Sequence, residues 1–491
     1  MSKKRRHSAI AQTIAIMAKN DLMLGVGMAL GYVTILIPAL TNKNAKEFIY
    51  LNDTEISWIG SLMPVSSFLG GIVSGPVTEP FGRKHSMMIW SIPLVLSTII
   101  FYIANQLWHL YIAIFLGGLT AGIVQAPVLS YVAEVTEPRL RGMLSATNVL
   151  TIFLGIFLQF VVGSVVDWRT AALIMGIAPL SAFFWLWFVP ETPYWLLARN
   201  KSDQALQSLA WLRGWVALDD VKEEFEQIRV GYLEPVSNNK DTRKEPLKTS
   251  IVDKYCTKSF LWPLGLVSFF YILPSFSGIT TLITFAVVVF STLRVSIPKY
   301  EATVLMGLAQ FVGCFLCIFC IKYWGKRVTG VVSITGVCLC NIFVGIYAYL
   351  YDIIKLDFDV ADNTNSELKY KWVPLFFLVS LAFIGNCGLK NLPYILSGEV
   401  FSNDTRSVGC GLSISFFFIS YFLSARFLLA TISLLTLPGL FWAYACMCAI
   451  GLLVVIFGLP ETEGKTLEEI INHFNGTCKI SSNKTQTYSD A

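Results

Sequence analysis

Runs of about 20 apolar residues recur along the whole chain, and they constrain its fold more than any other feature. Apolar residues make up 55% of the 491 residues and charged residues 14%, whereas soluble domains carry about 25% charged residues. A run of this length can cross a bilayer as a helix. Barrel strands would instead alternate over about ten residues. The runs are continuous, so they predict an all-α membrane protein.

Twelve spans are predicted, six on each side of one long polar stretch. They lie near 22–40, 57–79, 86–105, 110–132, 145–166, 171–189, 261–290, 302–322, 329–351, 373–397, 411–431 and 437–459. The predicted parts of the chain are a tail (1–21), a six-helix half (22–189), a loop with short helices (190–259), a second six-helix half (260–460) and a second tail (461–491).

Lysine and arginine gather at the ends of the spans on one side of the predicted bundle. Such residues mark the cytoplasmic side of a membrane protein, so both termini and the 190–259 loop are predicted to be cytoplasmic. The plasma membrane is the expected location. Asn52-Asp53-Thr54 then lies outside and matches the pattern of an N-glycosylation site.

The composition and motifs argue against several other functions. None of the eleven cysteines precedes Cys256, and none falls in a predicted outer loop, so we expect no disulfide framework. Cys314, Cys317 and Cys320 read as small residues on one helix face, and we predict no metal site. A net charge of +5 is no argument for nucleic acid. No nucleophile–base constellation or phosphate loop is evident, so we expect neither an enzyme nor a cofactor. No motif defines a protein partner or an oligomeric state.

Three short patterns occur twice in the same order. EPFGRKHS (79–86) matches KYWGKRVT (322–329), a Glu–Arg pair with six residues between its members closes the fourth and tenth spans, and Pro-Glu-Thr closes the sixth and twelfth. The chain therefore contains two parallel pseudo-repeats. Charges at inner helix ends can fasten and release two halves that rock against each other. The predicted gating residues are Arg83, Glu134, Arg141, Glu191, Lys326, Arg327, Glu399, Arg406 and Glu461.

These motifs, together with SWIGSLMPVSSFLGG, PETPYWLL and PETEGKTLEEI, resemble the signatures of sugar porters of the major facilitator superfamily. The resemblance covers about residues 15–475. VDWRTAALI and the stretch that follows PETPYWLL are most similar to insect facilitated trehalose transporters. The resemblance implies a major facilitator fold and facilitative uniport of a sugar or polyol by alternating access at a central site.

The resemblance also implies which residues line that site. They are Asn148, Ser277, Thr280, Thr281, Lys390, Asn391, Tyr394 and Phe418. Several positions depart from the family. Pro274 and Ser275 stand where the family has two glutamines, and Val149 stands where it often has one. Sugar recognition relies on amide and hydroxyl groups that pair with sugar hydroxyls, so this site has lost several of the expected partners.

Three functions stay open at this point. They are a carrier of a sugar (trehalose, hexose) or polyol, a sensor of the same fold that does not transport, and a carrier of an anionic small solute. Lys390 supports the third, because it stands near the predicted bilayer centre where the family has glycine. It could donate to sugar hydroxyls or attract an anionic group. Asp21 is placed at the boundary of the first span, which then contains no acid, so we expect no coupling to protons.

Overall fold

The computed structural model describes residues 3–41, 49–237, 257–358, 369–401 and 406–459. Every element within these ranges is helical. This agrees with the all-α prediction, and it follows from the need to satisfy backbone hydrogen bonds within each apolar segment in lipid. Eleven of the helices are long and apolar enough to cross a membrane.

The N-terminal half consists of eight helices. They are α1 (Lys3–Thr41), α2 (Asp53–Phe81), α3 (Arg83–Ile103), α4 (Leu107–Ile123), α5 (Gln125–Val135), α6 (Pro138–Val165), α7 (Trp168–Met175) and α8 (Ile177–Phe188). The fourth predicted span is formed by α4 and α5 together, and the sixth by α7 and α8. Helix α1 is longer than its predicted span, because most of the predicted tail 1–21 is helical and continuous with it.

Within the described residues, the C-terminal half contains nine helices. They are α13 (Lys258–Phe276), α14 (Ile279–Thr284), α15 (Ala286–Thr292), α16 (Lys299–Trp324), α17 (Lys326–Leu350), α18 (Trp372–Cys387), α19 (Leu392–Val400), α20 (Arg406–Arg426) and α21 (Leu428–Gly458). The predicted seventh span, 261–290, is covered by three shorter helices, α13 to α15. The count of long continuous spans is therefore eleven where the sequence predicted twelve.

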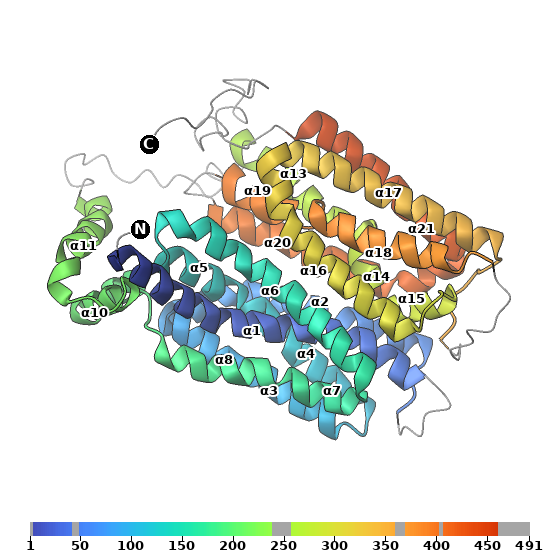
Figure 1. The fold of residues 1–491 in the computed structure, drawn as a ribbon, viewed down its shortest axis with the longest axis horizontal. Coiled ribbons are helices and arrows are strands. Elements are labelled where there is room, and N and C mark those ends of the chain that lie inside the picture. The colour runs from blue at the N-terminus through green and yellow to red at the C-terminus, as the bar shows by residue number, and fades with distance from the viewer. Residues whose placement is uncertain (1–2, 42–48, 238–256, 359–368, 402–405, 460–491) are drawn as a thin grey trace.

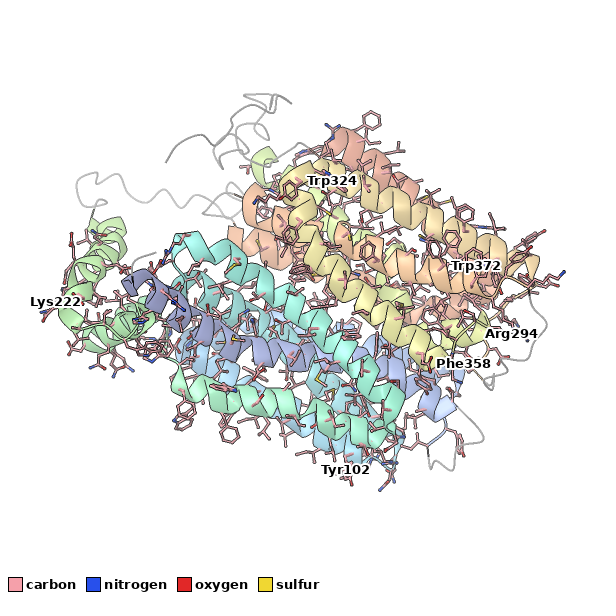
Figure 2. The ribbon with its side chains drawn as sticks, viewed as in Figure 1. Tyr102, Lys222, Arg294, Trp324, Phe358 and Trp372 are labelled. Atoms are coloured by element: carbon pink, nitrogen blue, oxygen red, sulfur yellow. The ribbon has the colours of Figure 1, made fainter. Side chains whose placement is uncertain are left out.

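Short helices connect the halves at one end of the bundle. They are α9 (Pro193–Ala198), α10 (Ser202–Leu212), η1 (Leu218–Val221) and α11 (Lys222–Ser237). They bury a small apolar cluster of their own that includes Leu197, Leu209 and Phe225. Figure 1 shows α10 and α11 beyond the bundle at the end where the chain begins. In Figure 2, Tyr102, Arg294 and Trp372 lie toward the opposite end. We call these the inner and outer ends.

The helix contacts within the two halves are equivalent. Span one packs on span five (α1 with α6), and span seven packs on span eleven (α13 with α20). Span two packs on span four (α2 with α4), and span eight packs on span ten (α16 with α18). The third and sixth spans pair, as do the ninth and twelfth (α17 with α21). This matching set of contacts is the structural form of the sequence repeat.

The halves meet along three seams that obey the same symmetry. Helix α2 packs on α20, and α6 packs on α16, so spans two and eleven form one seam and spans eight and five form its counterpart. In the third seam α1 contacts α14 and α15, so span one meets span seven. Figure 1 shows the two halves lying side by side, blue to green for one and yellow to red for the other.

Candidate functional site

Two spans of the C-terminal half are broken near the middle. Gly278 separates α13 from α14 with φ +84°, and an added Cβ there would lie 2.6 Å from the Tyr444 ring. Between α18 and α19, the turn from Gly388 to Asn391 is held by Ser333 Oγ, which accepts from the Leu389 N–H at 2.9 Å. Breaks of this kind are tolerated at membrane depth where they are enclosed by protein or line a cavity.

Buried polar atoms without a partner gather around these breaks. They are Thr280 Oγ1, Asn386 Oδ1, Asn391 Oδ1 and both amide atoms of Gln310. The helices that carry them are in close contact. A Cβ at Gly385 of α18 would touch Ile279 of α14, and one at Gly313 of α16 would lie 2.4 Å from the Phe383 carbonyl of α18. Leaving such a group unpaired costs about 1–3 kcal/mol, so this cluster is suited to a polar ligand.

Two members of the cluster, Gln310 and Asn386, were missed by the sequence reasoning. Both are fully buried. The available signal was an amide in the middle of an otherwise apolar span, which is costly unless it has a function or a partner. Thr280 and Asn391 were predicted, and the structure places both in this cluster.

Other predicted site residues are already engaged within the C-terminal half. Ser277 Oγ donates to the Pro274 carbonyl at 3.2 Å. Thr281 Oγ1 lies 2.6 Å from Ser424 Oγ. Their hydroxyls stabilise the broken span, and they are not among the unpaired atoms.

The predicted aromatic residues of the site pack against neighbouring rings. Tyr394 packs edge-on against Tyr271, with ring centroids 5.2 Å apart. Phe418 packs against Phe417, with ring centroids 5.4 Å apart. The structure thus brings these side chains into aromatic contacts within the C-terminal half.

Two lysines lie well inside candidate spans, away from the span ends. Asn148 of α6 accepts a hydrogen bond at 3.3 Å from Lys19 of α1, a residue that the sequence had placed in the N-terminal tail. Lys390 projects from the break in span ten, with Nζ 4.8 Å from the ring centroid of Phe153 on α6. Lys390 therefore reaches from one half to the other.

The hydrogen bonds described across the seams lie toward the outer end. Arg426 at the end of α20 donates to Ser57 Oγ on α2 at 2.7 Å, and its guanidinium lies 4.7 Å from the centroid of the Trp58 ring. Ser57 Oγ in turn donates to the Arg426 carbonyl. On α1, Thr34 Oγ1 donates to the Ile283 carbonyl of α14 at 3.0 Å. We call the Ser57–Trp58–Arg426 group the outer clasp.

At the inner end, three predicted gating residues of the N-terminal half, Arg83, Glu134 and Glu191, form one cluster. Arg83 pairs with Glu134, Nη2 to Oε1, at 2.8 Å. Thr192 Oγ1 donates to Glu134 at 2.6 Å. Glu191 accepts from the backbone N–H groups of Arg83 and Lys84 at 3.0–3.1 Å. These groups belong to one half, so the described contacts fasten spans two, three, four and six to each other.

The glycine of the repeated turn has the same conformation in both halves. Gly82 has φ +86° and ψ 175°, and Gly325 has φ +81° and ψ 170°. A Cβ at Gly82 would lie 2.5 Å from Glu191 Oε2. The left-handed φ and this close approach explain why glycine occupies the turn.

The gating residues of the C-terminal half are less fully described. Lys326 is buried at the start of α17, and Arg327 donates to the Ile456 carbonyl of α21. The side chains of Arg141, Glu399 and Arg406, and residue Glu461, lie outside the described residues. Their predicted role in gating is therefore not tested.

The inner end of α1 is tied to the rest of the half. Ser8 and Gln12 both donate to the carboxylate of Glu137. Burial alone would raise the pKa of Glu137, but hydrogen bonds from Ser8 and Arg139 and the nearby guanidinium of Arg213 outweigh it and lower that pKa below its ordinary value. This residue lies between two candidate spans.

Two predicted positions, Asp21 and Asn52, also have defined surroundings. Asp21 lies inside the candidate span Arg6–Thr41, not at its boundary, and it accepts from Ser181 Oγ at 2.9 Å. The premise that the first span contains no acid is therefore wrong. Exposed Asn52 caps α2 through a reciprocal pair of hydrogen bonds with Glu55, in which its side-chain oxygen is the acceptor.

A surface cavity of about 620 Å³ lies at the inner end, lined by His85, Glu191, Trp195 and Lys201 among others. It lies between α3 and α10 and is distinct from the polar cluster of the C-terminal half. The unpaired groups suited to a polar ligand lie beside the broken helices, not in this cavity.

Comparison with known families agrees with this architecture. The sequence profile described as "Sugar (and other) transporter" matches residues 22–474. The chain belongs to this family. Among curated relatives, the facilitated trehalose transporters Tret1 of Bombyx mori and Culex quinquefasciatus are 27% and 25% identical over 94% of the chain, which covers 86% and 85% of their lengths. The Anopheles gambiae relative is 26% identical over 94% of the chain, which spans 55% of its length.

Solved structures of sugar transporters share the fold. The proton:xylose symporter XylE bound to 6-bromo-6-deoxy-D-glucose superposes with a TM-score of 0.70 at 17% identity, covering 95% of this chain and 100% of that one. The partially occluded inward open conformation of XylE from E. coli gives 0.69 at 16% identity, covering 93% and 99%. The chain is thus a multi-pass membrane protein of the sugar transporter family with the major facilitator fold.

Proposed function

We propose that this member of the sugar transporter family is a facilitative carrier of a sugar, such as trehalose or a hexose, or of a related polyol. Its substrate would bind between the halves, beside the broken spans, and would be released by rocking one half against the other. The family membership and the trehalose-transporting relatives support this proposal. It also implies that the chain is not an enzyme and needs no cofactor.

The observation that carries the proposal is the cluster of unpaired polar atoms around Thr280, Gln310, Asn386 and Asn391. The Gln310 amide can donate and accept, and the Oδ1 atoms of Asn386 and Asn391 can accept, so these groups are suited to sugar hydroxyls. The family's span-seven glutamines are absent here. In this proposal Gln310 and Asn386 supply amide groups instead, from the eighth and tenth spans.

We further propose that the inner cluster and the outer clasp act as gates. The outer clasp holds the outer ends of α2 and α20 together, and the Arg83–Glu134 pair stabilises the inner ends of the N-terminal half. The inner end is proposed to face the cytoplasm with both termini, in the plasma membrane. Asn52 would then be glycosylated outside, since its capping bond occupies only the side-chain oxygen.

Proteoliposomes with the purified protein test the proposal directly. Radiolabelled trehalose, glucose and polyols should equilibrate down their gradients and show counterflow. Replacing Gln310 with leucine should weaken substrate affinity about tenfold, as expected for one lost amide pairing. Saturable binding without flux would instead identify a sensor, and no binding by any sugar or polyol would refute the proposal.

Asp21 provides the test of uniport. Its carboxylate lies within the first candidate span, where such groups often carry protons. Ser181 donates to it, and no ion pair of Asp21 occurs among the described side chains. The proposed uniport predicts that a pH gradient does not drive accumulation of the substrate and that Asp21→Asn retains downhill flux. Uphill accumulation that is lost in Asp21→Asn would identify a proton symporter.

A further inference from the structure

Two lysines stand well inside candidate membrane spans, away from the span ends, without an acidic partner. Lys19 belongs to the span Arg6–Thr41, and Lys390 to the span Trp372–Ser397. Among the side chains that the structure describes, neither lies within ion-pair distance of a carboxylate. Taking an ammonium group out of water without a counter-ion costs several kcal/mol. Such residues in membrane spans usually mark a pathway for substrate or ions.

Lys19 is fully buried between α1 and α6. A lysine ammonium has three N–H donors. The one acceptor within hydrogen-bond distance in the described structure is the neutral Asn148 Oδ1 at 3.3 Å. Because Asn148 carries no charge, it orients the ammonium without cancelling its field. The positive potential of Lys19 therefore extends into the surrounding low-dielectric interior.

Lys390 is half-buried and reaches from the C-terminal half to the N-terminal half. It projects from the turn between α18 and α19, and its Nζ lies 4.8 Å from the ring centroid of Phe153 on α6. A cation–π contact is worth about 0.5–2 kcal/mol, which is less than the cost of an unpaired buried charge. The ring thus holds the lysine in place and leaves it able to bind an anion.

The two lysines contact the same stretch of α6. Asn148 and Phe153 are five residues apart, or about 7.5 Å along the helix axis. Next to Lys390 stands Asn391, whose Oδ1 is unpaired, and the same half contributes the unpaired amide of Gln310 and the unpaired Asn386 Oδ1. This region therefore combines positive charge with groups that pair with hydroxyls.

We propose that Lys390 binds an anionic group between α6 and the turn that joins α18 to α19, beside the α6–α16 seam, so that the preferred substrates are hydroxylated carboxylates such as sugar acids. The carboxylate lies against Lys390, the hydroxyl groups pair with Gln310 and Asn386, and Lys19 adds positive potential from behind α6. The inference rests on the proposed function, since it takes this seam as the substrate site. A free chloride ion offers the same negative charge, and the experiment below distinguishes the two sources.

The test measures by calorimetry the equilibrium binding of glucuronate, glucose and chloride to the full-length protein in nanodiscs. Wild-type protein should bind glucuronate more tightly than glucose. Lys390→Met should lower glucuronate affinity about 30-fold or more, as for loss of one partner of a buried charge pair, and should change glucose affinity by less than about threefold. Lys390→Arg keeps the charge and should retain most of the binding.

Lys322→Met is the matched control. Lys322 also lies over an aromatic ring, with Nζ 5.9 Å from the Tyr323 centroid, but it is exposed at the inner end of α16. Its loss should leave both affinities unchanged. If Lys390→Met does not fold, binding to the wild-type protein still tests the proposal, because chloride should compete with glucuronate and not with glucose.

The outcomes separate the possible sources of the anion. Binding of chloride that depends on Lys390, without tighter binding of glucuronate than of glucose, would assign the site to an inorganic anion. Equal affinity for glucuronate and glucose, unchanged in Lys390→Met and insensitive to chloride, would overturn the proposal. Because binding is measured without transport, Lys390-dependent glucuronate binding without any flux would refute only the proposed carrier function. If neutral sugars are transported, glucuronate does not inhibit their flux and Lys390→Met retains it, only the anion site is refuted.

Discussion

Replacing Arg426 with leucine should open the outer seam between α2 and α20. In the outer clasp the Arg426 guanidinium lies 4.7 Å from the Trp58 ring centroid and donates to Ser57 Oγ at 2.7 Å. Both Arg426 and Trp58 are partly exposed, so the cation–π contact is worth about 1 kcal/mol. The charged hydrogen bond adds about 1–1.5 kcal/mol. Together they stabilise the closed outer end by about 2 kcal/mol, or about 30-fold in the equilibrium between closed and open.

Amide hydrogen exchange of the protein in nanodiscs measures this equilibrium. Opening the seam exposes the outer ends of α2 and α20, so their exchange should become about 30-fold faster in Arg426→Leu if opening is fast relative to exchange. Arg169→Leu is the matched control. Its guanidinium lies 4.2 Å from the centroid of the Trp168 ring and it donates to the Ala104 carbonyl, all within the N-terminal half.

A double-mutant cycle with Trp58→Leu isolates the contribution of the ring. The two substitutions should couple by about 1 kcal/mol, because they remove the same contact. Exchange at the outer ends that is unchanged in Arg426→Leu, or that rises equally in the Arg169→Leu control, would show that the clasp does not hold the halves together.

Three further substitutions and one control probe the N-terminal half. Glu134→Gln removes the ion pair with Arg83 and should slow net flux severalfold while leaving equilibrium substrate affinity nearly unchanged; a large loss of affinity at an unchanged turnover rate would contradict a gating role. Gly82→Ala places a Cβ in a turn with φ +86° and should cost about 1–3 kcal/mol of stability in thermal unfolding, whereas Gly75→Ala, in open space on α2, should be neutral or slightly stabilising. The folded-state pKa of Glu137 is lowered, so its contribution to stability is complete above the unfolded pKa of about 4.3 and is lost as pH falls through the folded value. The melting temperature should therefore decline less steeply below about pH 4 in Glu137→Gln than in the wild type. Parallel curves of melting temperature against pH for the two proteins would exclude this role.

The sequence predicted the spans and the repeat well because both depend on local properties. An apolar run long enough to cross a bilayer must satisfy its backbone groups as a helix wherever it packs. The repeated turn was equally visible, since Gly82 and Gly325 are required by a backbone conformation that few other residues adopt. Breaks in the seventh span were not predicted, because Ser277-Gly278 sits in a run whose hydropathy does not change.

The candidate site was only partly predictable, because it depends on which helix faces meet. Gln310 and Asn386 carry no motif, and their unpaired atoms become evident only when α16 and α18 are packed together. Ser277 and Thr281 were expected to face a ligand, but they bond to neighbours inside their own half. Lys19 was placed in a tail because the apolar run begins at Leu22, yet the helix extends without interruption back to Lys3.

Helix α1 is continuous, so a tilt at its inner end displaces its outer end. Ser8 near one end bonds to Glu137 and to the Leu212 carbonyl of α10, and Thr34 near the other bonds to the Ile283 carbonyl of α14 in the opposite half. These two attachment points are 26 residues apart, or about 39 Å along a helix that cannot shorten. A tilt of about 5° about the inner attachment would therefore swing the outer one by about 3 Å, the length of one hydrogen bond. A small rotation imposed by the short helices at the inner end is thus enough to break the contact between spans one and seven.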